Sequence, residues 1–227
     1  MKAGAIDHLD ELRRRLLVVL VWFLMFFGFG IIISPLILKK LITDLIVLNV
    51  KLITLTPLEF LYTQIKIGFI LAIALSLPNI IYHLVMFAKP ALKKREIKGI
   101  KFILPGFILF FIIGVVFAYV VFLKLSIYFL ARLAPLAGIQ NFWSINSFIS
   151  FILYLCLSIG IIFELPLVLM LLVKLGVIKK RSLKKYRPYV YVSAFIIAAI
   201  ITPPDMITQI ILALPIILLY ELSLLMF

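Results

Sequence analysis

The stretch Arg13–Ile33, RRRLLVVLVWFLMFFGFGIII, sets three arginines directly before an uninterrupted apolar run. A helix needs about 20 apolar residues to cross the roughly 30 Å hydrocarbon core of a bilayer, so this run is long enough to span a membrane. Arginines before apolar residues also occur in secretory signal peptides, but no small-residue cleavage site follows and further apolar runs do. We therefore interpret the stretch as the first membrane anchor.

Similar apolar runs repeat to the end of the chain. Of its 227 residues, 66% are hydrophobic and only 14% are charged, a composition typical of a multi-spanning membrane protein. We predict an all-α, polytopic protein that forms a single integral-membrane domain over residues 1–227. The six predicted spans cover about residues 16–38, 61–87, 102–130, 147–173, 189–201 and 206–227.

Basic residues gather on one side of the predicted membrane. Lysine and arginine cluster in the N-terminal segment, between spans two and three, and between spans four and five. Because cytoplasmic loops carry an excess of these residues, we expect both termini in the cytoplasm and the protein in the cytoplasmic (inner) membrane. The net charge of +14 fits contact with anionic lipid, since the basic residues flank apolar runs, and we expect no nucleic-acid partner.

Two stretches differ from simple spans. The loop over residues 39–60 is unusually apolar, so we expect it to form short amphipathic helices at the outer interface or a cap over the bundle. Span five is short before Thr202, and span six soon meets Glu221. Because Pro203 and Pro204 cannot continue a helix, we expect a turn there and a hairpin of two short helices.

The sequence offers little support for an enzyme. Cys156 is the only cysteine, and two histidines are too few and too scattered for a convincing metal site. The chain shows no glycine-rich phosphate loop and no nucleophile with a nearby base. We expect no catalytic site, no metal and no cofactor.

Glu164 is the acidic residue whose position in the sequence most needs an explanation. It lies near the middle of span four, where a carboxylate costs about 3 kcal/mol even on the lenient insertion scale. We expect it to face protein or a water-filled cavity, either as a functional acid or as a neutral group bonded to a neighbouring helix. Pro166 removes a backbone hydrogen bond and is expected to kink the helix there.

Other polar side chains have structural interpretations. Lys66 is expected to extend along its span to the outer interface. Ser144 belongs to a polar segment able to cap the start of span four. Gln209 is placed to bond Thr202 or Asp205 across the hairpin.

Two acids stand among bases on the predicted cytoplasmic side. Glu11 precedes residues 13–15, all arginine, and Glu96 follows residues 93–95, all basic. The residues alone favour local charge balance, in which each acid pairs with a nearby base at small cost or gain. The functional alternative is a cationic ligand, because each carboxylate can take a guanidinium in bidentate fashion.

A series of short motifs resembles the TatC family, the multi-spanning receptor component of the twin-arginine protein translocase. Each motif is weak by itself, but their order and spacing cover essentially the whole chain. Members usually continue into a short charged tail, whereas this chain stops at Phe227. The motifs are His8-Leu9-x-Glu11-Leu12-Arg13-x-Arg15-Leu16, Thr56-Pro57-x-Glu59, Phe87-x-x-Pro90-Ala91-Leu92 with Glu96, Phe163-Glu164-Leu165-Pro166, Arg187-Pro188-Tyr189, Thr202-Pro203-Pro204-Asp205 with Gln209, and Ala213-x-Pro215 with Leu219-Tyr220-Glu221.

The resemblance implies six transmembrane helices in a concave, glove-like bundle, with both termini cytoplasmic and the last two helices short. It also implies recognition of twin-arginine signal peptides. The positions associated with signal-peptide binding in the family correspond to Glu11, Arg13, Phe87 and Glu96. The positions associated with translocation and partner contact correspond to Glu164, Pro57, Asp205 and Gln209.

Partners and an energy source are implied in the same way. The family exports folded proteins with single-span amphipathic subunits of the TatA and TatB type, as a receptor complex with several copies of the chain, using the proton-motive force. A proton-coupled secondary transporter with Glu164 as its intramembrane site is the alternative; it predicts an internal repeat, and no convincing one is visible. A purely structural scaffold is the third possibility, and it predicts that Glu164→Ala leaves export intact.

Overall fold

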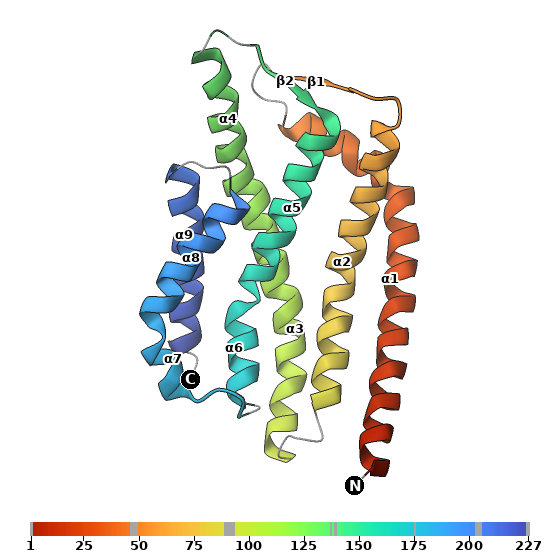
Figure 1. Cartoon of the computed structure of the whole chain (residues 1–227), viewed down its shortest axis with the longest axis vertical. Coiled ribbons are helices and arrows are strands. Elements are labelled where there is room, and N and C mark those ends of the chain that lie inside the picture. The colour runs from red at the N-terminus through yellow and green to blue at the C-terminus, as the bar shows by residue number, and fades with distance from the viewer. Residues whose placement is uncertain are drawn as a thin grey trace.

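The computed structural model describes residues 2–45, 50–88, 94–136, 138, 140–174, 176–202 and 206–225. Within these ranges it describes the side chains except those of residues 2–9, 45, 85, 87–88, 94–104 and 133–134. The described chain is a bundle of long helices with two short strands at one end (Figure 1). The prediction of an all-α bundle is confirmed.

Successive long helices alternate in direction along the long axis of the molecule (Figure 1). The third span comprises α3, a π-helical turn η2 and α4, and the fourth comprises α5 and α6. In chain order the helices are α1 (Lys2–Leu45), α2 (Glu59–Ala88), α3 (Lys94–Phe117), η2 (Ala118–Leu123), α4 (Lys124–Leu136), α5 (Ile145–Phe163), α6 (Leu165–Lys174), α7 (Lys180–Lys185), α8 (Arg187–Ile201) and α9 (Met206–Leu225).

Each predicted span coincides with one of these helical segments. Among the described residues, five segments are long and apolar enough to cross a membrane, and α8 is a shorter apolar helix. Five of the six segments run past at least one predicted edge, because hydropathy marks only the part of a helix that lies in hydrocarbon, whereas α9 begins at the predicted residue 206. The five long segments are Asp10–Asp44, Glu59–Leu84, Pro105–Arg132, Ile145–Lys174 and Met206–Leu225.

α1 continues past Pro35, which the sequence placed near the end of the first span. A proline has no N–H, so the carbonyl of Ile31, four residues earlier, loses its helical donor. The hydroxyl of the buried Ser34 donates to that carbonyl at 2.8 Å. A neighbouring side chain thus replaces the missing bond, and the helix extends to Leu45.

α1 and α2 approach most closely at a pair of glycines. A Cβ added at Gly30 would lie 2.8 Å from the Cα of Gly68 and 2.9 Å from its carbonyl oxygen. On the same interface, the rings of Phe23 and Phe27 meet the edge of Phe69 with centroids 5.6 and 6.4 Å apart. Small residues allow such close packing between membrane helices, so these glycines set the spacing of α1 and α2.

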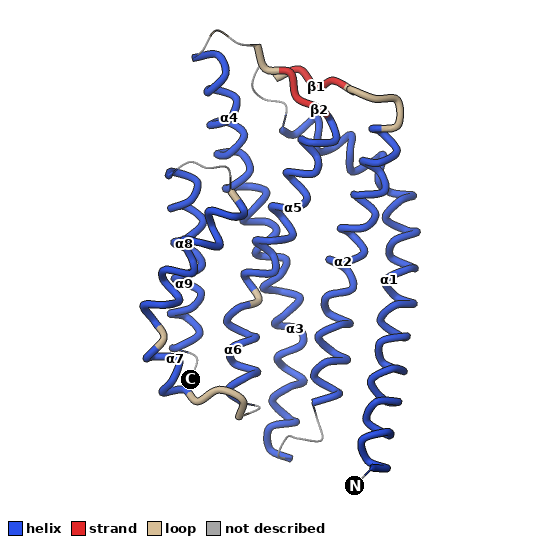
Figure 2. The backbone as a smooth tube through the Cα atoms, in the orientation of Figure 1, coloured by secondary structure: helices blue, strands red, loops and turns tan. Residues whose placement is uncertain are grey.

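The connection between α1 and α2 meets the connection between α4 and α5 in a small cap (Figure 2). β1 (Lys51–Ile53) and β2 (Phe142–Ser144) pair in parallel, with Lys51 opposite Phe142. The predicted cap is therefore confirmed. Residues 39–45 are helical, as the other expected arrangement had it, but they form the last turns of α1 rather than separate helices. We call this end of the bundle the capped end.

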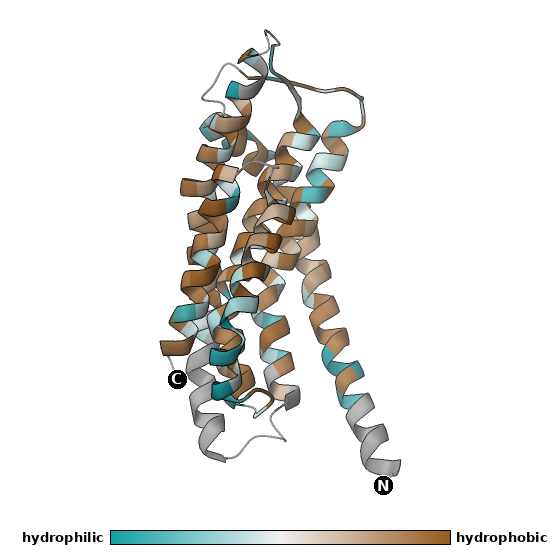
Figure 3. Ribbon diagram, turned by 60° about the vertical axis from the view of Figure 1, so that its left-hand side comes forward, coloured by the Kyte–Doolittle hydropathy of each residue, from teal (hydrophilic) through white to brown (hydrophobic). Residues whose placement is uncertain are grey.

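The opposite end holds the N-terminal turns of α1, the start of α3, and α7, and the chain's two termini lie toward it (Figure 1). Arginines 13–15 lie on α1 at this end, and α7 carries four further basic residues. Hydrophobic residues predominate along the helices, with hydrophilic ones concentrated toward their ends (Figure 3). We call this the basic end, and its position agrees with the predicted clustering of lysine and arginine on one side.

α8 and α9 form the predicted short hairpin. α8 has 15 residues and α9 has 20, or about 22 and 30 Å at 1.5 Å per residue, which makes them the shortest of the six apolar segments. The expectation that Glu221 interrupts the last helix is wrong, since α9 continues to Leu225. The carboxylate of Glu221 is held by partners on α8, so it does not stop the helix.

The fourth span is interrupted where the sequence predicted. α5 ends at Phe163 and α6 begins at Leu165. The N–H of Glu164 bonds the carbonyl of Ile161, only three residues back, at 3.1 Å, and Pro166 has no N–H to offer the preceding turn. The break sets Glu164 at a junction between two helices.

Candidate functional site

Glu11 forms an ion pair within α1. The Nη2 and Nε atoms of Arg15 lie 2.6 and 3.0 Å from the same carboxylate oxygen of Glu11. The side chain of Glu11 is 38% exposed and that of Arg15 is 24% exposed, so water reaches the pair. Local charge balance is therefore confirmed for Glu11, and the geometry also places a guanidinium on a carboxylate at the basic end.

A groove runs beside this pair. It has a volume of about 530 Å³ and is lined by Arg13 together with apolar residues of α1 that include Leu16, Leu20 and Phe23. Leu12 and Arg13 lie at the end of the groove nearer the N-terminus, and the other apolar residues follow along the helix. The groove thus combines one cation near its start with a hydrocarbon surface.

Phe87 and Glu96 lie at the same end of the bundle. Phe87 is in the last turn of α2, and Glu96 is in the first turn of α3. Because α2 runs antiparallel to α1, both positions stand at the basic end with Glu11 (Figure 1). Their side chains lie outside the described part of the chain, so the contacts of these two residues stay predictions.

Glu164 is buried within the bundle, with 5% of its surface exposed. The prediction that this acid faces protein is confirmed. Its Oε2 atom has no hydrogen-bond partner among the described residues, so the expected bond to a neighbouring helix is not observed for this oxygen. A buried polar atom without a partner is costly, and such an atom marks a place where an additional group can bind.

Gln209 joins the two helices of the hairpin, but not through the predicted partners. Its Nε2 donates to the carbonyl of Phe195 on α8 at 3.1 Å. Thr202 instead turns its hydroxyl back to the carbonyl of Ala198 at 2.9 Å. Gln209 lies one turn inside α9, so it meets the body of α8 rather than the tip of the hairpin. Asp205, the other predicted partner, lies outside the described residues.

The base of the hairpin is held by a charged cluster that the residue patterns alone did not single out. Arg187 Nη2 lies 2.6 Å from Oε2 of Glu221, and the hydroxyl of Tyr191 donates to Oε1 at 2.6 Å. The hydroxyl of Tyr220 donates to the carbonyl of Leu183 on α7 at 2.6 Å. These bonds tie α7, α8 and α9 together at the basic end.

At the capped end, Pro57 lies in the turn before α2. The side-chain hydrogen bonds of this turn are made by Glu59, two residues further along. Glu59 is buried, with 4% exposed. Its Oε2 accepts the N–H groups of Leu55 at 2.5 Å and Thr56 at 3.4 Å. Its Oε1 accepts the N–H of Asn146 at 3.0 Å and the hydroxyl of Ser144.

One carboxylate therefore caps two helices. Glu59 reaches back to the N–H of Thr56, as in a capping box at the start of α2. It also bonds the first turn of α5, where Ser144 is the N-cap and accepts from the N–H of Ser147 at 3.3 Å. Two helix N-termini, each with a partial positive charge, meet at this anion. The Thr56-x-x-Glu59 spacing was the sequence signal for half of this arrangement.

Lys66 extends the same network. Its Nζ donates to Oδ1 of Asn146 at 2.8 Å and to Oγ of Ser150 at 3.0 Å. Both acceptors lie in the first two turns of α5, so the side chain extends toward the capped end and ends on α5. Its expected reach to the outer interface stays a prediction. Glu59 and Lys66 together bind α2 to α5.

The fold and these sites define a polytopic helical membrane protein with a solvated acid among bases at one end and a hydrogen-bonded cap at the other. The family model for TatC, the Sec-independent protein translocase protein, matches residues 7–215. The chain belongs to the TatC family.

Relatives in several bacteria support this family assignment. The TatC protein of Aquifex aeolicus is 38% identical over 220 residues, covering 96% of this chain and 91% of the relative. The Helicobacter pylori (strain 26695) protein is 41% identical over 228 residues, covering 96% and 85%. A crystal structure of the twin-arginine translocase receptor TatC in DDM has a TM-score of 0.84 at 38% identity and covers 96% of this chain and 98% of its own.

Proposed function

We propose that this protein is the receptor component of a twin-arginine translocase, acting as one integral-membrane domain over residues 1–227. Its basic end faces the cytoplasm and binds the twin-arginine signal peptides of folded precursor proteins. The observation that carries this proposal is the Glu11–Arg15 pair, in which a water-accessible carboxylate at the basic end already holds a guanidinium. Solved relatives are described as the twin-arginine translocase receptor, which supports the same function.

Recognition follows from exchange of guanidinium groups. One arginine of the signal peptide replaces Arg15 at Glu11, and the next binds Glu96 at the start of α3. Both bonds are charge-assisted and directional, which favours arginine over lysine. The surrounding basic residues repel loosely held cations, so a closely fitted pair of arginines is retained.

The apolar part of the signal peptide then lies in the groove along α1. Arg13 stands near its start, after Leu12, and Leu16, Leu20 and Phe23 continue it as a hydrocarbon surface. Phe87, in the last turn of α2, lies at the same end and adds an aromatic contact in this proposal. The order of charged and apolar surfaces matches a signal peptide that begins with arginines and continues with apolar residues.

Partner subunits bind deeper in the membrane. Single-span amphipathic subunits of the TatA and TatB type contact the α8–α9 hairpin with Gln209 and Asp205, while Pro57 acts through the connection before α2. Glu164 offers its Oε2, which has no partner within the described part of the chain, to a polar group of such a helix. Several copies of the chain form the receptor complex, and the proton-motive force drives export.

Signal-peptide docking is tested by photo-crosslinking a twin-arginine peptide to Glu11→Gln, Glu96→Gln and the double variant. We expect the double variant to lose about tenfold or more of the crosslink, because a hydrogen bond to a charged group contributes about 1.5–3 kcal/mol. Asp10→Asn is the matched control, since Asp10 is an exposed acid on the same helix. Unchanged crosslinking in the double variant would remove this assignment.

A further inference from the structure

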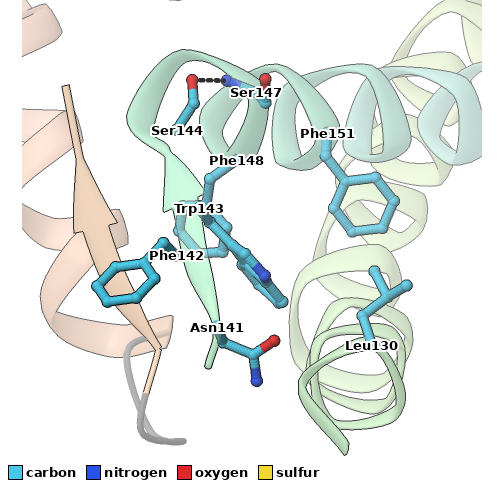
Figure 4. Close-up of a pocket in the computed structure, with 8 residues that line it drawn as sticks. All are labelled: Leu130, Asn141, Phe142, Trp143, Ser144, Ser147, Phe148 and Phe151. Carbon is cyan, nitrogen blue, oxygen red and sulfur yellow. Dashed lines mark hydrogen bonds between the residues drawn. The ribbon is translucent and has the colours of Figure 1, made fainter. Parts of the chain in front are cut away.

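A second cavity lies at the capped end, far along the bundle from the signal-peptide groove. Its volume is about 660 Å³, and it opens between β2, the end of α4 and the start of α5 (Figure 4). Leu130 of α4, Trp143 of β2, and Phe148 and Phe151 of α5 supply its apolar walls. The volume is within the range of about 300–1,000 Å³ that is typical of sites for small molecules.

Two polar side chains that line this cavity are already bonded to protein. The amide of Asn141 donates to the carbonyl of Ala131 at 2.7 Å. The hydroxyl of Ser144 donates to Glu59 and accepts from the N–H of Ser147. The hydroxyl of Ser147 and the indole of Trp143 also line the cavity, whose walls are otherwise mostly apolar, so hydrocarbon is the chemistry that fills most of the space at least cost.

The depth of the cavity matches the outer part of a membrane leaflet. Ile145 begins a membrane-spanning segment, and Phe151 lies six residues further along it, or about 9 Å at 1.5 Å per residue. Leu130 is close to Arg132, where the preceding span ends. Trp143 stands at the level where tryptophan is enriched in membrane proteins, between headgroups and acyl chains.

A cation lies on β1, the strand that pairs with β2 of the cavity wall. Lys51 pairs with Phe142 in the β1–β2 ladder, and its N–H donates to the carbonyl of Asn141 at 3.1 Å. Its side chain is exposed. Among the described residues the two ion pairs are Arg15–Glu11 and Arg187–Glu221, so no described carboxylate neutralises Lys51. An apolar cavity with an unneutralised cation beside it complements an anion that carries a hydrocarbon chain.

We propose that this cavity binds an anionic phospholipid of the surrounding leaflet, with an acyl chain against Trp143, Phe148 and Phe151 and the phosphate at Lys51. The lipid fills the space between β2 and the two helix ends. Glu59 is the positioning residue for this site, because it fixes Ser144 and Asn146 and with them the strand that carries Trp143. The site is independent of signal-peptide binding at the basic end.

The experiment uses tryptophan fluorescence. The chain has two tryptophans, Trp22 and Trp143, so Trp22→Phe leaves Trp143 as the only reporter. Phosphatidylglycerol with dibrominated acyl chains is titrated into the full-length protein in detergent micelles. We expect quenching of Trp143 that saturates at a single lipid per chain. The reverse variant, Trp143→Phe, reports from Trp22 on the exposed face of α1 and should show only gradual, unsaturable quenching.

Two further variants test binding of the lipid's acyl chain and of its headgroup separately. Ser147→Phe adds bulk at an exposed residue of the cavity wall and should abolish the saturable phase. Lys51→Gln should raise the half-saturating concentration of phosphatidylglycerol about fivefold, the effect of one basic residue at an anionic surface. Brominated phosphatidylcholine should be insensitive to Lys51→Gln.

The proposal is overturned if Trp143 is quenched as gradually as Trp22, or if Ser147→Phe leaves a saturable phase unchanged. Native mass spectrometry of the purified protein gives an independent readout that does not depend on fluorescence. A phospholipid adduct retained by the original chain and lost from Ser147→Phe supports the site, and equal adducts on both chains reject it. A free fatty acid in place of the phospholipid would overturn the headgroup assignment to Lys51.

Discussion

The capped end and the basic end each hold a glutamate, and the two are bonded in opposite ways. Glu59 is 4% exposed, and its two oxygens accept bonds from two separate chain connections. Glu11 is 38% exposed, and it is paired with Arg15 one turn further on the same helix. The first carboxylate joins elements that are distant in sequence, whereas the second is bonded only to its own helix.

This difference separates the scaffold from the proposed binding surface. Removing a buried acceptor leaves several donors without partners, so the structure depends on Glu59. An exposed ion pair contributes little to stability and can exchange its partners at small cost. A glutamate, Glu59, thus fixes the architecture at the capped end, whereas another glutamate, Glu11, stays available to the proposed ligand at the basic end.

The largest effect is expected from Glu59→Gln. The substitution turns an acceptor oxygen into an N–H donor that faces backbone N–H groups of the cap. We expect the greatest fall in melting temperature of any carboxylate variant, measured by thermal unfolding in detergent. Asp44→Asn is the control, since exposed Asp44 accepts a single bond, from the hydroxyl of Tyr119. An unchanged melting temperature for Glu59→Gln would contradict the claim that the fold depends on Glu59 more than on Glu11.

A second test lies where α1 meets α2. Gly30→Leu forces a side chain against the backbone of Gly68 and should destabilise the fold by about 2 kcal/mol, as overpacking does. Gly28→Leu is the matched control, because a Cβ at Gly28 meets nothing within 4 Å. Denaturant titration of both variants measures the difference, and equal stabilities would show that the glycine pair does not set the helix spacing.

The hairpin base should give an intermediate effect. Glu221→Gln weakens the bond to Arg187, whose side chain is 43% exposed, so we expect a loss of about 1 kcal/mol or less. Exchanging the charges, with Arg187→Glu and Glu221→Arg together, should recover part of this loss. A double variant less stable than either single change would contradict pairing as the stabilising contact.

The smallest effect on stability is expected from Arg15→Gln, about 0.5 kcal/mol or less for a pair one turn apart. Its effect on binding should be opposite to that of Glu11→Gln. Without Arg15, Glu11 is free for the incoming arginine, so a twin-arginine peptide should bind more tightly in a titration. Arg14→Gln is the control on the same turn, and weaker binding by Arg15→Gln would reject the exchange of guanidiniums.

Local patterns predicted the parts of this fold that depend on neighbouring residues. The apolar runs located the helices, the lysines and arginines marked the basic end, and Ser144 was recognised as a helix cap. The break at Glu164 followed from the proline two residues later. These features need no knowledge of which helices touch.

The contacts that hold the bundle together were not predictable in this way. Lys66 reaches Asn146, 80 residues away, and Gly30 meets Gly68 across an interface that a single sequence does not reveal. Helix α1 passes Pro35 because a serine hydroxyl replaces one hydrogen bond, a detail of side-chain geometry. At the candidate site, the sequence identified Glu11 but not the role of Glu59, whose two sets of donors come from different connections.

The bend in α1 has a mechanical consequence. The last turns of α1 leave the direction of its first turns and cross toward the third span (Figure 1). There the hydroxyl of Tyr119, in the π-helical turn, donates to Asp44. The far end of α1 is therefore anchored to a second span, so any tilt of its first turns is opposed by contacts with η2 as well as with α2.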